Sequence, residues 1–63
     1  RSGTELRSQR TRLRIVDAYL ELATNRDLND IDVQDVTLVA GLNRSTYYLH
    51  FSGRQPLRDE VIA

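Results

Sequence analysis

The chain carries few side chains that could do covalent chemistry, and their spacing argues against catalysis. Ser45, His50 and an aspartate are the residue types of a nucleophilic set. On one helix, Ser45 and His50 would lie about 140° apart around the axis, so they could not hydrogen-bond. A chain of 63 residues also leaves little room for the pocket that an active site needs. We therefore expect no enzyme activity and no catalytic residue.

Metal and cofactor sites are also not expected. Asp27, Asn29, Asp30 and Asp32 lie close together like the ligands of a calcium loop, but the glycine and the twelfth-position glutamate of such a loop are missing. The chain has no Cys and one His, which excludes a thiolate zinc site. Its three glycines are isolated, so no glycine-rich phosphate loop is present.

One polar stretch suits a different chemistry, the recognition of DNA. Arg44 can form a bidentate contact with guanine, and Thr46 can touch a thymine methyl group or a phosphate. Ser45 is small, so a helix that carries it can approach base edges closely. Tyr48 and His50 can donate hydrogen bonds to phosphate oxygens.

The elements that would position this stretch begin with a helix over about residues 11–25. Its apolar side chains recur at helical spacing, which places Leu13, Val16, Leu20 and Ala23 on the expected buried stripe and Ile15, Tyr19 and Leu22 beside it. Residues 1–10 show no such period, so we expect a flexible, Arg-rich arm there. In the DNA-binding interpretation this arm follows phosphates or enters a minor groove.

Two short helices are predicted next, over residues 33–40 and 44–51. Asp32 and Asn43 are expected N-caps, and Gly41 is expected to end the first of the two in the left-handed conformation. The expected inward side chains are Val33, Val36, Val39 and Ala40 on the first helix, and Tyr47 and Phe51 on the second, with Leu42 as a staple between them. A short break with glycine between two helices is typical of a helix-turn-helix.

A fourth helix is predicted over residues 54–63. Ser52 and Gln55 have the spacing of a capping box, with Gly53 as the alternative last residue before the helix. Pro56 falls in the first turn, where its missing N–H costs little. Leu57, Val61 and Ile62 give the apolar face. The expected fold is all-α, a homeodomain-like three-helix bundle with a helix-turn-helix, plus the start of a fourth helix, forming one domain over residues 11–63.

The charge distribution favours a polyanion partner more than the net charge does. All nine basic residues are Arg, nine residues are acidic, and the formal net charge is zero. The balance is +4 over residues 1–14, −5 over residues 15–40 and +1 over residues 41–63. Basic ends can meet DNA, although a solvated tail beside a solvated acidic helix explains the pattern equally well. No apolar run is long enough for a membrane span and no signal peptide is visible, so we expect a cytoplasmic protein.

Three segments carry a resemblance to a known family. Ile15-Val16-Asp17-Ala18 with Leu22, the run from Val36 to Phe51, and the run from Ser52 to Leu57 keep their spacing without a gap. The second run resembles an A-G-V-S-x-G-T-L-Y-x-H-F signature, and the third resembles S-x-K-x-x-L. Residues 15–57 thus resemble the N-terminal DNA-binding domain of TetR-type transcriptional regulators.

The resemblance implies roles for individual residues. Arg44, Ser45 and Thr46 fall at base-reading positions, and Tyr48 and His50 at positions that grip phosphate. Gln34 falls where the family contacts base or phosphate, Arg54 where it places a Lys near phosphate, and Tyr47 becomes half core and half groove contact. The candidate DNA-binding residues are therefore Gln34, Asn43, Arg44, Ser45, Thr46, Tyr47, Tyr48, His50 and Arg54. Asp32 departs from the family's usual Thr, and its carboxylate both caps a helix and repels a nearby phosphate.

For the intact protein the resemblance implies a ligand-responsive repressor of the bacterial cytoplasm, associated with the nucleoid. Two copies would bind a pseudo-palindromic double-stranded DNA operator as a homodimer. A C-terminal domain absent from this chain would form the dimer and bind a small-molecule effector. The alternative is a helix-turn-helix that binds another protein and no DNA, which an apolar outer face on the third helix would favour.

Overall fold

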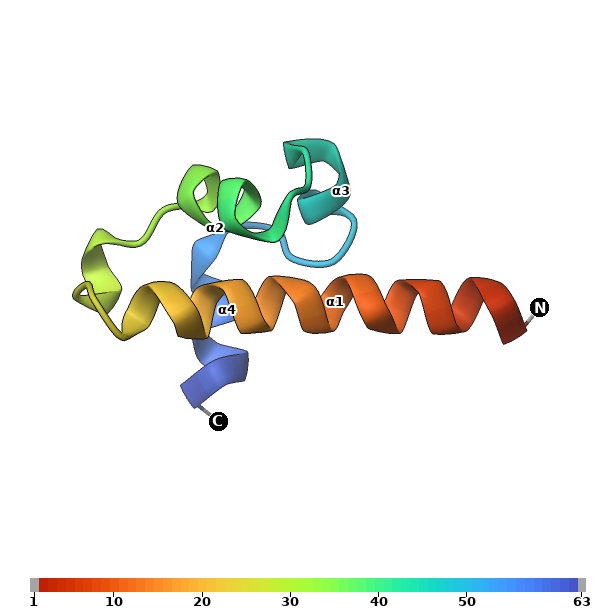
Figure 1. The fold of residues 1–63 in the computed structure, drawn as a ribbon, viewed down its shortest axis with the longest axis horizontal. Helices are drawn as coiled ribbons and strands as arrows, with labels where there is room; N and C mark the ends of the chain where they lie inside the picture. Colours follow the sequence, from red (N-terminus) through yellow and green to blue (C-terminus); the bar gives the residue numbers. More distant parts are fainter. Residues whose placement is uncertain (1, 63) are drawn as a thin grey trace.

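The computed structural model describes residues 2–62 and contains helices but no strand in that range. The elements are α1 (Ser2–Ala23), the 3-10 helix η1 (Leu28–Asp30), α2 (Val33–Ala40), α3 (Arg44–Tyr48) and α4 (Arg54–Ile62). Figure 1 shows α1 as the long axis of the molecule, with α2 and α3 on one side of it and α4 crossing it. The expected all-α fold with a helix-turn-helix and a further helix is confirmed.

One hydrophobic core joins these elements. Its buried members are Ile15, Ala18, Tyr19, Ile31, Val33, Val36, Ala40, Tyr47, Phe51 and Leu57. They come from all four α-helices and from the turns beside them, so detaching any one helix from the bundle would expose apolar surface to water. Tyr47 and Phe51 point inward as predicted, and Leu42 packs against the core from the turn between α2 and α3.

The predicted buried stripe of α1 is wrong in part. Leu13 and Leu20 are 60% and 45% exposed, whereas Ile15, Ala18 and Tyr19 are buried. Apolar residues cover more than one face of this helix, so periodicity alone admits two neighbouring orientations. The structure buries the face with the larger Tyr19 ring, which removes more apolar area from water.

The first helix also begins earlier than predicted. Residues 2–10 form the first turns of α1, so the helix start predicted at about residue 11 is wrong. The flexibility expected for this segment stays a prediction. Neither Gly nor Pro occurs between Thr4 and Ala23, and lengthening an existing helix avoids the cost of nucleation. The predicted ends at Arg1 and Ala63 lie outside the described residues.

The caps around the helix-turn-helix follow the sequence closely. The Asp32 carboxylate accepts a hydrogen bond from the Val33 N–H at 2.8 Å, and Asp35 accepts one from the Asp32 N–H at 3.2 Å. The Asp32 side chain also accepts from the Asp35 N–H, and this bond together with the one from the Asp32 N–H to Asp35 forms a capping box. The helix α2 occupies the predicted residues 33–40. Gly41 ends α2 with φ 73°, in the left-handed region, as predicted. On α2, however, Val39 is 43% exposed rather than inward.

Replacing Gly41 with alanine should lower the free energy of unfolding by about 1–2 kcal/mol, because an L-residue strains in the left-handed region. A Cβ at Gly41 would meet only the Arg14 side chain, at 3.9 Å, so the cost is conformational rather than steric. Urea unfolding followed by circular dichroism measures the change. Gly53→Ala is the matched control, because its φ is not positive and its Cβ meets nothing within 4 Å. Equal losses in both variants would contradict this account.

The last helix starts at Arg54, directly after Gly53. The predicted capping box between Ser52 and Gln55 is wrong, because the Gln55 amide donates to Asp59 at 3.1 Å instead. Pro56 lies in the first turn and Leu57 is buried, as predicted. Val61 is half-buried against the core, whereas Ile62 is 61% exposed.

Candidate nucleic-acid interface

Tyr47 anchors α3 in the core. Its side chain is 0% exposed, and its hydroxyl donates a hydrogen bond to the Gly53 carbonyl at 2.6 Å. The ring centroid lies 5.8 Å from that of Phe51 and 5.4 Å from that of Tyr48, which meets it edge to face. Tyr47 therefore holds α3 against the start of α4. The groove contact predicted for it does not fit this buried position.

Burial also changes the acidity of this side chain. It is the main reason that the pKa of Tyr47 is raised from 10.0 to about 12, because the buried phenolate would lose its hydration. Charge repulsion from the phenolates of Tyr48 and Tyr19 contributes to the same rise in pKa. The hydroxyl thus stays protonated and remains a hydrogen-bond donor at neutral pH.

The start of α3 is organised by Asn43. Its Oδ1 accepts hydrogen bonds from the Thr46 N–H at 3.0 Å, the Thr46 hydroxyl at 2.9 Å and the Ser45 hydroxyl at 2.9 Å. Asn43 is therefore the predicted N-cap, and it also fixes the orientation of two candidate base-reading side chains. Arg44 is exposed beside them, and its Nη2 donates to Gln34 Oε1 of α2 at 3.4 Å.

These contacts bring five of the predicted residues together on the outer face of α2 and α3. Gln34, Asn43, Arg44 and Ser45 are exposed, and Thr46 is half-buried. Among residues 6–62, whose side chains the structure describes, no carboxylate lies within ion-pair distance of Arg44. Its charge is therefore not neutralised by a neighbour, and the guanidinium can meet an anion or a base edge. We refer to Gln34, Asn43, Arg44, Ser45 and Thr46 as the helix-turn-helix face.

Two further candidates follow on or just after α3. Tyr48 is 49% exposed, and His50 is half-buried. The α-helix ends at Tyr48 rather than at Phe51, although the N–H groups of His50 and Phe51 both donate to the Tyr47 carbonyl. The Tyr48 ring packs edge to face on Tyr47, and His50 follows in the turn after α3.

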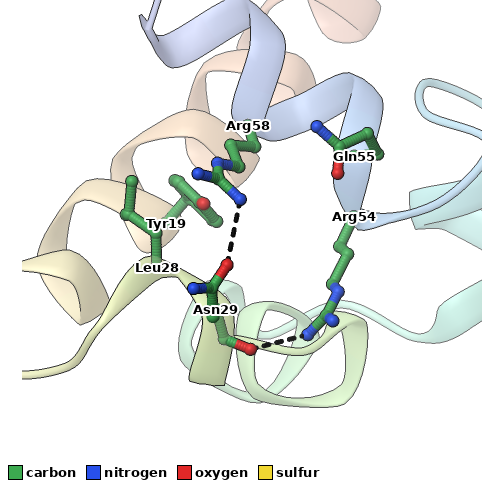
Figure 2. A pocket seen from close by; sticks show the side chains of 6 residues that line it. All are labelled: Tyr19, Leu28, Asn29, Arg54, Gln55 and Arg58. Atoms are coloured by element: carbon green, nitrogen blue, oxygen red, sulfur yellow. Dashed lines mark hydrogen bonds between the residues drawn. The ribbon is translucent and has the colours of Figure 1, made fainter.

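Arg54 lies elsewhere. Its Nη1 donates to the backbone carbonyls of Asn29 at 3.1 Å and Ile31 at 3.2 Å, so it ties the start of α4 to the segment before α2. Arg58 donates to Asn29 Oδ1 at 3.1 Å from the next turn of α4 (Figure 2). The sequence did not lead us to predict that Asn29 and Arg58 contact each other. The spacing of Arg54 and Arg58, four residues apart, places both on one helix face and was the signal that could have indicated a shared partner.

The acidic side chains near α2 are largely committed to local contacts. Asp32 and Asp35 form the capping box, and Asp35 also pairs with Arg26 at 3.0 Å. Asp27 caps η1 by accepting from the Asn29 N–H at 3.1 Å. Of the four residues that resembled a calcium loop, Asp27 and Asp32 are therefore helix caps, and Asn29 accepts a hydrogen bond from Arg58. Over the described part of the chain, no group of three or more potential metal ligands gathers, and no helix is long and apolar enough to cross a membrane.

The known proteins to which this chain is similar include several HTH-type transcriptional regulators. The HTH-type transcriptional regulator SrpR of Pseudomonas putida is 32% identical over 95% of this chain and 28% of its own length. An uncharacterized HTH-type transcriptional regulator of Mycobacterium tuberculosis is 39% identical over 97% of this chain and 32% of its own length. TtgW, an uncharacterized HTH-type transcriptional regulator of Pseudomonas putida, is 32% identical over 95% of this chain and 45% of its own length.

The chain spans less than half the length of these curated relatives. No family model matches it, and no solved structure matches it. The similarity nevertheless runs along almost the whole chain, including the helix-turn-helix face. The chain is thus similar to one part of HTH-type transcriptional regulators.

Proposed function

We propose that this chain is a DNA-binding unit of a transcriptional regulator and that α3 enters the major groove. The observation that carries the proposal is the helix-turn-helix face itself. There Asn43 fixes Ser45 and Thr46, and Arg44 reaches Gln34 of α2 with no carboxylate to neutralise it among the side chains of residues 6–62. Polar groups on the first turn of a recognition helix are the ones that reach base edges. The names of the relatives support this function.

Each side chain has a role in this proposal. Arg44 donates to the O6 and N7 acceptors of guanine, and Gln34 contacts a neighbouring base or phosphate. Ser45 and Thr46 approach base edges, where the Thr46 methyl group can meet a thymine methyl. Tyr48 and His50 donate to phosphates, which positions the domain without reading sequence.

The Nη1 group of Arg54 is bonded to Asn29 and Ile31, so this side chain can contact a phosphate only through its Nε and Nη2 groups. We expect its contribution to DNA affinity to be smaller than that of Arg44. Tyr47 is not part of the proposed interface, because it is buried.

For the intact regulator we propose the TetR-type arrangement that the sequence resembles. Two copies bind a pseudo-palindromic operator in the bacterial cytoplasm, and a further part of the protein holds the homodimer and binds a small-molecule effector. Effector binding favours a dimer in which the two α3 helices no longer match the half-site spacing, so the proposed repressor leaves the operator and repression is relieved. A single copy binds weakly, because linking two sites raises affinity without any new contact.

The test of DNA binding is a fluorescence-anisotropy titration of the chain with a random duplex pool at 50 and 200 mM salt. Affinity should fall linearly with salt on a logarithmic scale, because cationic side chains release counterions from the phosphates. Selection of sequences from the bound pool then gives the half-site. If the chain is folded by circular dichroism but binds no duplex at 50 mM salt, the proposed function is wrong for this chain.

A second candidate function is a helix-turn-helix that binds another protein. The observation that favours it is apolar exposure, because Leu38 and Leu49 are 71% and 82% exposed on or beside α2 and α3. Binding through these leucines would depend little on salt, in contrast to binding through phosphates. Leu49→Ser separates the two functions, because it should abolish an apolar interface while the salt-dependent DNA affinity stays measurable.

Replacing Arg44 with alanine should lower the discrimination between the preferred half-site and one with its guanine replaced by about 1–3 kcal/mol. The reason is the loss of two parallel hydrogen bonds to one base edge. Competition anisotropy with the two duplexes measures the difference. Tyr48→Phe is the contrasting variant, because losing a phosphate contact should weaken both duplexes alike. A uniform loss for Arg44→Ala would assign this side chain to a phosphate instead.

A further inference from the structure

A small cavity lies on a part of the molecule away from the helix-turn-helix face, between α1, η1 and α4. Its volume is about 70 Å³, and its lining residues are Tyr19, Leu28, Asn29, Arg54, Gln55 and Arg58. Figure 2 shows the two arginines of α4 reaching toward Asn29 across this space. Because a water molecule occupies about 30 Å³ of liquid, the cavity has room for about two waters or one small ion.

The charge of this cavity is positive and not neutralised. Arg54 and Arg58 both line it, and no carboxylate does. Within the described side chains of residues 6–62, neither arginine forms an ion pair with a carboxylate; their bonds go to Asn29 and Ile31. Each of these bonds uses only an Nη1 group, so the other N–H groups of both guanidinium ions remain available as donors.

Tyr19 provides the independent observation. Its side chain is 1% exposed and lines the cavity, and no hydrogen bond joins its hydroxyl to another described residue. Because no fully enclosed polar side-chain atom in the described range lacks a partner, this hydroxyl is not sealed off from solvent. The hydroxyl is therefore free to donate a hydrogen bond to a group bound beside the two arginines.

We propose that this cavity binds one phosphate-sized oxyanion, held by Arg54, Arg58 and the Tyr19 hydroxyl. The unsatisfied groups here are donors, and two of them are cationic, which matches the acceptor oxygens and charge of a phosphate group. The group can be free inorganic phosphate or a phosphodiester of bound DNA, which share this chemistry. The proposal stands without the DNA-binding function, because its evidence lies wholly in α1, η1 and α4.

The test compares thermal unfolding of the chain in sodium phosphate and in sodium chloride at equal ionic strength. Four proteins are used: the wild type, Tyr19→Phe, Arg58→Gln, and Arg14→Gln as a control that removes a charge from another face of α1. At a phosphate concentration about five times the dissociation constant, the Tm of the wild type should rise by about 4–8 °C. Arg14→Gln should keep this rise, and the two cavity variants should lose it.

Phosphate also stabilises proteins through general exclusion from their surface, which acts on all four proteins alike. Equal Tm increases in all four would therefore overturn the proposal. Tyr19→Phe removes a single hydroxyl without a protein partner, so it should fold in chloride at least as well as the wild type. If Arg58→Gln does not fold, Tyr19→Phe against Arg14→Gln gives the answer alone.

A second experiment identifies the source of the phosphate group once the Tm difference is established. Duplex DNA is titrated into the wild type and Tyr19→Phe in phosphate-free buffer. Several-fold weaker DNA binding by Tyr19→Phe assigns the cavity to a DNA phosphodiester. Unchanged DNA affinity, or no DNA binding by either protein, assigns it to the free ion.

Discussion

Replacing Phe51 with alanine should lower the free energy of unfolding by about 3–5 kcal/mol. Phe51 is 4% exposed, and its ring packs beside that of Tyr47. The Arg12 guanidinium carbon lies 4.6 Å from the ring centroid, so the ring also connects α1 to the end of the helix-turn-helix. A chain of 63 residues buries a smaller share of its surface on folding than a larger domain does, so its stability is small and a loss of this size takes most of it.

Urea unfolding followed by circular dichroism measures the Phe51→Ala effect, and a variant without helix at zero denaturant would satisfy the prediction. Leu49→Ala is the matched control, because Leu49 lies two residues earlier and is 82% exposed. It should change the free energy of unfolding by less than about 0.5 kcal/mol. Comparable losses in the two variants would mean that Phe51 is not a core residue in solution.

The second large effect is a loss of stability at alkaline pH that depends on Tyr47. Its folded pKa is about 12, against an ordinary value of 10.0. Between these values the unfolded chain releases the proton and the folded chain keeps it, so the unfolded state binds fewer protons. The free energy of unfolding is therefore unaffected below pH 10 and falls as pH rises toward 12. The slope is about 1.4 kcal/mol per pH unit, or about 2–3 kcal/mol over the window.

Urea midpoints measured from pH 8 to pH 12 test this dependence. Tyr47→Phe should be less stable than the wild type at pH 8, because the Gly53 carbonyl loses its donor at 2.6 Å. It should nevertheless lose less stability on going to pH 12. Tyr48→Phe serves as the control, since Tyr48 is 49% exposed. Parallel pH curves for the wild type and Tyr47→Phe would contradict the raised pKa.

The parts of the fold that the sequence predicts well are those determined by neighbouring residues. Asp32, Gly41 and Asn43 act on backbone groups within a few positions, so residue type and spacing are sufficient to place α2 and the start of α3. The inward positions of Tyr47 and Phe51 follow from helical spacing for the same reason. The same local chemistry places Arg44 beside two hydroxyl side chains at the helix-turn-helix face.

Features that depend on distant residues were not predictable in this way. Which face of α1 is buried is decided by α2 and α4 packing against it, and the exposed Leu13 and Leu20 follow the same helical period as buried residues. The bond from Arg54 to the carbonyl of Asn29 joins residues 25 apart in the chain. The phosphate contact expected for Arg54 was therefore predicted without knowledge of its bonds to backbone carbonyls. No short sequence motif indicates the cavity that Arg54 lines.

The Asn43 cap gives the start of α3 a polarity that a proposed operator would have to match. Both the Ser45 and Thr46 hydroxyl groups donate to Asn43 Oδ1, so toward a base these two hydroxyl groups present only lone pairs. In the major groove, lone pairs meet the amino groups of adenine and cytosine, whereas guanine offers acceptors. The Arg44 guanidinium has only hydrogen-bond donors, which match the acceptors of guanine. The expected half-site therefore places a guanine beside a base that carries an amino group, on whichever strand faces α3.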